Sequence, residues 1–211
     1  MDNKKYDLIE SNEYGRRFTV RFKQYEYDEP IENTNWVIKK NGCGPTSLAT
    51  ILASLGYNEN PISISRKMLF NEYGFLSNGY FEGTNGVSII YCLNKLIEEK
   101  LDIEYKIMKI NYEHPELMKK TIINMIKDGY MAIIAVGPQP NIFAQEGHYI
   151  VVTSLNRENN EFYISNSYRE GDNQIDITFS YEKIVKEIYR DNFDFLMIRK
   201  KDFSNYKKNH S

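Results

Sequence analysis

A cysteine flanked by two glycines is the residue of this chain best suited to nucleophilic chemistry. Cys43 lies in the stretch Asn-Gly-Cys-Gly-Pro-Thr-Ser-Leu-Ala, where Gly42 and Gly44 leave the backbone beside the thiol bare and open to another molecule. Pro45 is favoured at the first position of a helix, and the apolar spacing after it predicts a helix that runs to Gly56. A thiol at a helix start faces free N–H groups and the positive end of the helix dipole, which lower its pKa toward about 3.5–7.5. The plainer alternative is a buried cysteine ahead of a core helix, but packing alone does not require glycines on both sides.

A cysteine nucleophile needs a base, and the chain has three histidines. His210 lies in a lysine-rich C-terminal tail, and His114 precedes Pro115 at a predicted helix start, where a solvated or capping role suffices. His148 follows Gly147 and opens the run His-Tyr-Ile-Val-Val-Thr, which predicts a buried strand. We interpret His148 as the base. A half-buried strand histidine without a catalytic role is the alternative.

A third polar group that orients the imidazole is expected on the next strand. The run Glu-Phe-Tyr-Ile-Ser-Asn-Ser over 161–167 predicts that strand, and the polar residues 156–160 before it predict a hairpin turn. In such a hairpin Asn166 and His148 become cross-strand neighbours, so the Asn166 side-chain carbonyl can hold the imidazole in its working tautomer. Asp172 competes for this role, and the alternative for Asn166 is a turn residue at the strand end.

These motifs together resemble the papain-like cysteine peptidases. The branch that they resemble most includes the double-glycine leader peptidases of bacteriocin export and their bacterial relatives. The resemblance extends from about Gln24 to Asn166. It implies that Cys43 is the nucleophile, His148 the base and Asn166 the orienting group. It also implies an α+β fold, in which a helical half carries the cysteine and an antiparallel sheet half carries the histidine and the asparagine.

Two positions depart from the leader-peptidase pattern. Members of that branch place a glutamine side chain in the oxyanion hole, but the residue six positions before Cys43 is Val37. Gln24 is similar to the more distant glutamine of relatives with a longer lead-in, and we assign it to the oxyanion hole. An exposed polar residue near a strand end is the alternative for Gln24. The third group is often Asp in that branch, whereas Asn166 is more similar to papain itself. The departure at Val37 argues against an export-linked leader peptidase.

The segment that delivers the base is expected to touch the substrate. Residues 137–146 join two predicted strands and end at Gly147, so this loop should form a rim of the substrate cleft. We therefore expect Phe143, Gly147 and Gly42 to contact the substrate. A plain surface loop is the alternative.

The implied reaction is hydrolysis of a peptide or amide bond by a thiolate paired with a protonated histidine. The same groups would serve a cysteine acyltransferase or amidase, and a non-catalytic peptide-binding module is a third hypothesis. No metal or other cofactor is predicted, because the His, Cys and carboxylate residues show no metal-ligand spacing.

Length and composition predict one catalytic domain over 1–211, with a core of about 17–200 and a frayed tail over 201–211. The net charge is −2, from 27 basic and 29 acidic residues, and nothing points to nucleic acid as a partner. No apolar segment follows the N-terminal charges and none approaches the roughly 18 residues of a membrane span, so a cytoplasmic chain is expected. Secretion of a longer precursor stays open, and no pattern indicates an oligomeric state. Cys92 lies in an apolar helical stretch and is expected to be buried.

The predicted elements place helices first and antiparallel strands later, which is typical of an α+β fold with its active site between the two halves. Residues 57–83 are expected to be mostly irregular, with a short helix near 64–71. Further helices are predicted from Thr84 or Asn85 to about 100, over 115–129 and over 180–189. Strands are predicted at 17–22, 103–110, 131–136, 148–154, 161–166, 175–179 and 193–198.

Overall fold

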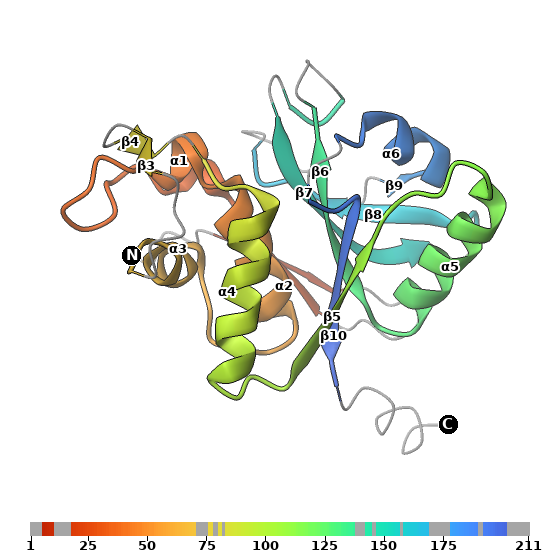
Figure 1. Ribbon diagram of the computed structural model, residues 1–211, viewed down its shortest axis with the longest axis horizontal. Helices are drawn as coiled ribbons and strands as arrows, with labels where there is room; N and C mark the ends of the chain where they lie inside the picture. Colours follow the sequence, from red (N-terminus) through yellow and green to blue (C-terminus); the bar gives the residue numbers. More distant parts are fainter. Residues whose placement is uncertain are drawn as a thin grey trace.

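The computed structural model describes residues 6–10, 18–70, 76–77, 80–81, 83–137, 142–144, 147–156, 158–168, 178–189 and 192–201. A group of helices lies on one side of an antiparallel sheet, and two further helices lie on the other side (Figure 1). The predicted mixture of helices and antiparallel strands is therefore confirmed.

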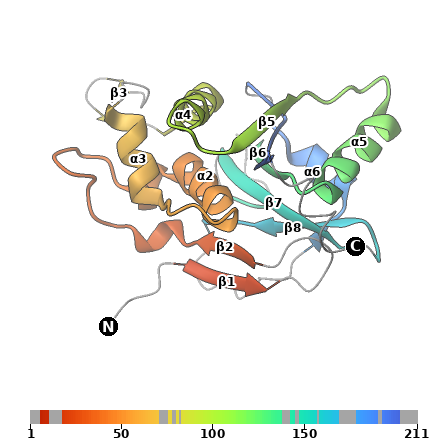
Figure 2. The same ribbon diagram turned by 90° about the horizontal axis from the view of Figure 1, so that it is seen from below.

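The helical half is built around one central helix. The helices here are α1 (Ile38–Asn41), α2 (Cys43–Ser54), α3 (Pro61–Phe70) and α4 (Gly86–Glu98), preceded by a 3-10 turn, η1 (Gln24–Glu26). Every residue of α2 from Gly44 to Leu52 is buried, because this helix is enclosed by α3, α4, the sheet and a hairpin of β1 (Tyr6–Glu10) and β2 (Phe18–Phe22) (Figure 2). The predicted stop of this helix is confirmed, since Gly56 takes φ +87° just after its end.

The sheet half contains six antiparallel strands in the order β5-β10-β6-β7-β8-β9. Their bounds are Ile103–Met108 (β5), Phe195–Lys200 (β10), Met131–Val136 (β6), His148–Asn156 (β7), Glu161–Ser165 (β8) and Thr178–Phe179 (β9). The helices α5 (Pro115–Lys127) and α6 (Tyr181–Glu187) cover the face away from α2 (Figure 1).

Strand β7 is buried on both faces, which explains its continuous apolar sequence. Tyr149 and Val151 belong to the hydrophobic core shared with α2, whereas Ile150 and Val152 belong to a second core shared with α5 and α6. Successive residues of a strand point to opposite faces, so β7 links the two cores. His148 stands at the beginning of this strand.

Several boundaries differ from the sequence predictions. Helix α3 begins at Pro61, earlier than expected, because Asn60 and Ser63 cap its first turn through two reciprocal hydrogen bonds of 2.9 Å. A short hairpin of β3 (Leu76–Ser77) and β4 (Tyr80–Phe81) lies in the stretch expected to be irregular. Strand β10 begins two residues later than predicted. The Asp194 carboxylate, just before the strand, accepts a hydrogen bond from the backbone N–H of Ile110. The predicted strand residues 175–177 lie outside the described residues.

Candidate active site

Cys43 is the first residue of α2, where the sequence pattern predicts it. The glycines beside it are required by packing within the chain. A Cβ atom on Gly42 would lie 2.5 Å from the side chain of Ile38, and one on Gly44 would lie 1.9 Å from the Thr84 hydroxyl oxygen. Close approach of the chain's own side chains, rather than an open path to the thiol, therefore explains both glycines. Whether Gly42 also contacts a substrate stays a prediction.

His148 and Asn166 lie together at one end of the β7–β8 hairpin. The Nε2 atom of His148 is 2.9 Å from Oδ1 of Asn166. The orientation of the Asn166 amide is fixed by a second hydrogen bond, in which its Nδ2 donates to the Phe143 carbonyl at 2.8 Å. Its Oδ1 also accepts the backbone N–H of Tyr168 at 3.1 Å. Since an amide oxygen only accepts, His148 must donate from Nε2, and Nδ1 is then the basic nitrogen.

The thiol of Cys43 lies against the strand that begins with His148. The backbone N–H of Tyr149, the next residue, hydrogen bonds to the thiol. The Tyr149 carbonyl accepts a hydrogen bond of 3.2 Å from Ser47, one turn further along α2. Thiol and imidazole thus belong to the same corner of the molecule. A direct sulfur–imidazole contact of about 4 Å or less, as a base and a nucleophile require, stays a prediction.

Burial favours the neutral forms of both groups. It raises the pKa of Cys43 above its ordinary value, although the backbone N–H groups of Tyr149, Gly44 and Cys43 itself oppose that shift. Burial also lowers the pKa of His148 to about 4, against the opposing hydrogen bond to Asn166. The sequence predicted a lowered cysteine pKa and an ion pair. Desolvation thus shifts the pKa of each group toward its neutral form, which opposes the predicted ion pair.

Acidification should destabilise the fold through His148. The folded-state pKa of about 4 lies below the ordinary value of 6.5, so the unfolded chain takes up the proton first and stability is lost as the pH falls through this window. Between pH 7 and pH 4 this histidine should lower the free energy of unfolding by about 3 kcal/mol. Urea unfolding of the wild type and His148→Gln at pH 7, 5 and 4 measures it. Equal pH dependence of the two proteins would contradict the assignment.

Gln24 is buried between the segments that carry the predicted nucleophile and the predicted orienting group. It is 2% exposed, which rules out the alternative of an exposed polar residue. Its Oε1 accepts a 3.1 Å hydrogen bond from the Ser167 hydroxyl, and its Nε2 donates to the Lys39 carbonyl at 3.3 Å. Ser167 follows Asn166, and Lys39 lies four residues before Cys43. One hydrogen of Nε2 is left for another acceptor, as an oxyanion donor requires.

Tyr168 is a residue that the sequence analysis missed. Its ring centroid lies 5.5 Å from that of His148, and the side chain is 42% exposed. The ring thus stands beside the imidazole at the surface and helps to bury it. An aromatic residue two positions after the predicted orienting group was the available signal.

The predicted loop residues divide between surface and core. The Phe143 ring is only 2% exposed and packs edge-on against Phe179 at 5.0 Å, so it is a core residue and not part of an exposed rim. Its carbonyl instead holds Asn166 in place. Gly147 is exposed, and its substrate contact stays a prediction. Asp172 lies outside the described residues.

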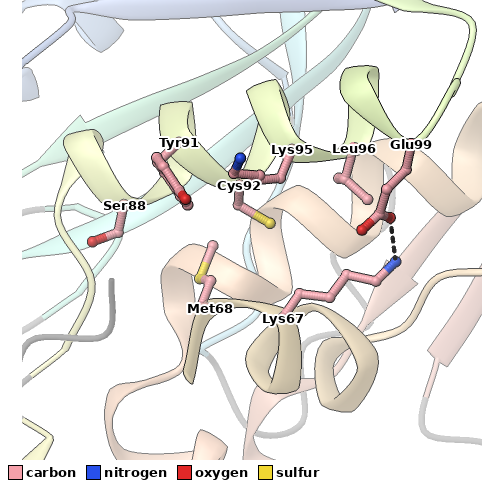
Figure 3. Close-up of a pocket in the computed structure, with 8 residues that line it drawn as sticks. All are labelled: Lys67, Met68, Ser88, Tyr91, Cys92, Lys95, Leu96 and Glu99. Atoms are coloured by element: carbon pink, nitrogen blue, oxygen red, sulfur yellow. Dashed lines mark ion pairs between the residues drawn. The ribbon is translucent and has the colours of Figure 1, made fainter. Parts of the chain in front are cut away.

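The second cysteine lies on a different helix, α4. Cys92 is 4% exposed and lines a pocket between α3 and α4, which an ion pair of Lys67 and Glu99 borders (Figure 3). Its predicted burial is confirmed, and burial raises its pKa to about 12. Both cysteines are free thiols.

Within the described part of the chain, no three His, Cys, Asp or Glu side chains form a group that could hold a metal ion. In that same part, no helix combines the length and apolar character needed to cross a bilayer.

Comparisons with known proteins give a family and a fold. A family model described as "Peptidase_C39 like family" matches residues 21–194. A solved structure described as a C39-like peptidase from Bacillus anthracis is similar, with a TM-score of 0.52 and 13% identity, over 87% of this chain and 98% of that one. A second is the peptidase domain of Streptococcus ComA, a bifunctional ABC transporter involved in a quorum-sensing pathway. It has a TM-score of 0.47 and 19% identity, over 75% of this chain and 90% of that one. No curated protein matches.

Proposed function

The chain belongs to the Peptidase_C39 like family, and from this premise we propose that it is a cysteine peptidase that hydrolyses a peptide or amide bond. Cys43 is the nucleophile, His148 the general base and Asn166 the orienting group. The observation that carries the proposal is the 2.9 Å contact of His148 Nε2 with Asn166 Oδ1. That contact leaves Nδ1 as the proton acceptor on the strand that the thiol touches.

The burial of both groups favours a reaction that starts from the neutral pair. As Sγ attacks the carbonyl carbon, its proton passes to Nδ1 of His148 and the N–H of Tyr149 stabilises the developing thiolate. The carbonyl oxygen becomes an oxyanion, which the backbone N–H at Cys43 and Nε2 of Gln24 stabilise. The imidazolium then protonates the leaving nitrogen as the C–N bond breaks. Water, deprotonated by His148, hydrolyses the thioester and the thiol is restored.

Two assays together test this function. A peptidyl epoxide followed by mass spectrometry measures covalent labelling of Cys43, and a peptide panel measures cleavage. Labelling of Cys43 together with cleavage is the expected result. Labelling and transfer of the acyl group to an amine, without hydrolysis, would identify an acyltransferase. Absence of both labelling and cleavage would indicate a peptide-binding module.

Asn166→Ala should slow acylation by about ten- to a thousandfold, because the variant loses the acceptor that holds the imidazole in its tautomer. Single-turnover kinetics with an amide substrate measures the rate. Asp172→Ala is the matched comparison and should leave the rate nearly unchanged. If Asp172→Ala slows acylation strongly and Asn166→Ala leaves its rate unchanged, the orienting group has been misassigned.

A further inference from the structure

We infer that Ser47 is a positioning residue of the proposed active site, which ties the helix of the nucleophile to the strand of the base. This inference rests on the proposed function. The serine hydroxyl has no direct role in the proposed proton transfer between Cys43 and His148. Its side chain is instead bonded to the backbone of the residue that follows the base.

Ser47 shares a face of α2 with Cys43. Ser47 lies four residues after Cys43, so the two side chains are neighbours on one face of the helix. Both reach the same residue of β7, because the thiol accepts the N–H of Tyr149 and the Ser47 hydroxyl donates to the Tyr149 carbonyl at 3.2 Å. Two adjacent turns of α2 thus hold both backbone polar groups of one strand residue.

The position of Tyr149 within the sheet leaves its backbone polar groups to α2. Tyr149 lies opposite Ala135 of β6, but the Ala135 carbonyl accepts the N–H of Tyr189. On the other side, the register of β7 with β8 begins at Val151, opposite Ser165. Tyr149 therefore lies beyond the paired residues of β8, and its backbone groups bond to Ser47 and Cys43 of α2. Since buried backbone groups require partners, Ser47 and Cys43 act here as substitutes for a neighbouring strand.

The contact between Ser47 and Tyr149 is buried. Ser47 is 3% exposed and Tyr149 6% exposed. Without the hydroxyl, the Tyr149 carbonyl would face a buried alanine methyl group. Helix and strand would then separate until water or another donor reached that carbonyl. A displacement of this kind moves Cys43 relative to His148, and a misplacement of about 1 Å can cost on the order of 100-fold in rate.

Helix α2 offers a matched control for this inference. Ser54 lies at the other end of the same helix, where its Oγ accepts the N–H of Val20 at 2.9 Å and donates to the Thr50 carbonyl at 2.6 Å. Ser54 therefore ties α2 to β2, just as Ser47 ties it to β7. Ser47→Ala and Ser54→Ala each delete one hydroxyl oxygen from α2. Only Ser47 adjoins the proposed catalytic groups.

The test measures three quantities on the full chain with each variant. These are the midpoint of urea unfolding, the pH profile of Cys43 alkylation by iodoacetamide, and kcat and KM for a cleaved peptide. Both variants should lower the unfolding midpoint. Only Ser47→Ala should move the alkylation profile to higher pH and lower kcat about 10- to 100-fold, with KM changed far less.

Each outcome decides the inference. Equal effects of the two variants on alkylation and kcat would overturn it, because a general loss of stability would then explain both. Alkylation does not depend on turnover, which separates the two proposals. A shifted profile in Ser47→Ala with no cleavage by the wild type would support the positioning role and refute the peptidase. Cleavage by the wild type, together with an unshifted alkylation profile and an unchanged kcat in Ser47→Ala, would support the peptidase and refute the positioning role.

Discussion

Cys43→Ala is expected to abolish peptide hydrolysis, with kcat/KM reduced by at least about 10⁴-fold. No other described thiol can replace it, because Cys92 is buried in α4 and its pKa is raised to about 12. The loss of one sulfur atom at a half-buried helix start should leave the fold intact. Chromatographic quantification of products from a peptide panel, alongside circular dichroism, measures both properties.

Cys92→Ala is the control for this result. This variant also removes one sulfur atom, but from a more deeply buried site. It should therefore lower the unfolding midpoint while kcat stays near the wild-type value. Residual hydrolysis by Cys43→Ala above a few thousandths of the wild-type rate would exclude Cys43 as the nucleophile. A loss of hydrolysis in Cys92→Ala with the fold retained would point to the second thiol instead.

His148→Gln is expected to reduce kcat/KM by on the order of 10⁴-fold, because in the proposed mechanism the imidazole takes the thiol proton. The wild type should also show an acid limb, in which kcat/KM falls tenfold per pH unit below pH about 4. The sign follows from the role of the imidazole, which accepts a proton only while it is neutral. Initial rates over pH 3–9 measure this limb.

The shape of that pH profile distinguishes the two resting states of the pair. A neutral pair predicts no decline of kcat/KM above pH 7, whereas an ion pair predicts a decline when the imidazolium loses its proton. A bell-shaped profile with an alkaline limb near pH 8 would therefore refute the neutral pair. His114→Gln is the control, since His114 is exposed at the start of α5 and makes no side-chain cap there. It should match the wild type at every pH.

The features predicted correctly from sequence depend on local signals. Gly-Cys-Gly-Pro followed by apolar residues at helical spacing marks the start of α2 at Cys43. Two segments rich in β-branched and aromatic residues, joined by a polar turn, predict the hairpin that brings Asn166 beside His148. Such signals involve residues close in the chain, so periodicity and turn chemistry are enough to find them.

The features predicted incorrectly depend on packing between distant segments. The raised pKa of Cys43 follows from burial against β7, which the nucleophile motif does not encode. The Phe143 ring enters the core because Phe179, more than thirty residues later, packs on it, although Phe143 lies in a stretch that resembles a surface loop. Gly44 is crowded by Thr84, a residue forty positions later in the chain. In each case the deciding contact is long-range, and a single sequence does not specify it.

The groups that meet at the proposed site are far apart in the sequence, so a newly made chain cannot assemble the site until late in its synthesis. Ser47 must wait for Tyr149, which is 102 residues later, and Gln24 must wait for Ser167, which is 143 residues later. At a synthesis rate of about 5–20 residues per second, the interval from Cys43 to Tyr168 takes roughly 6–25 s. During this time the thiol is already present, but the contacts that position the proposed site around it have not formed. A nascent chain should therefore gain this site only after Tyr168 has left the ribosome.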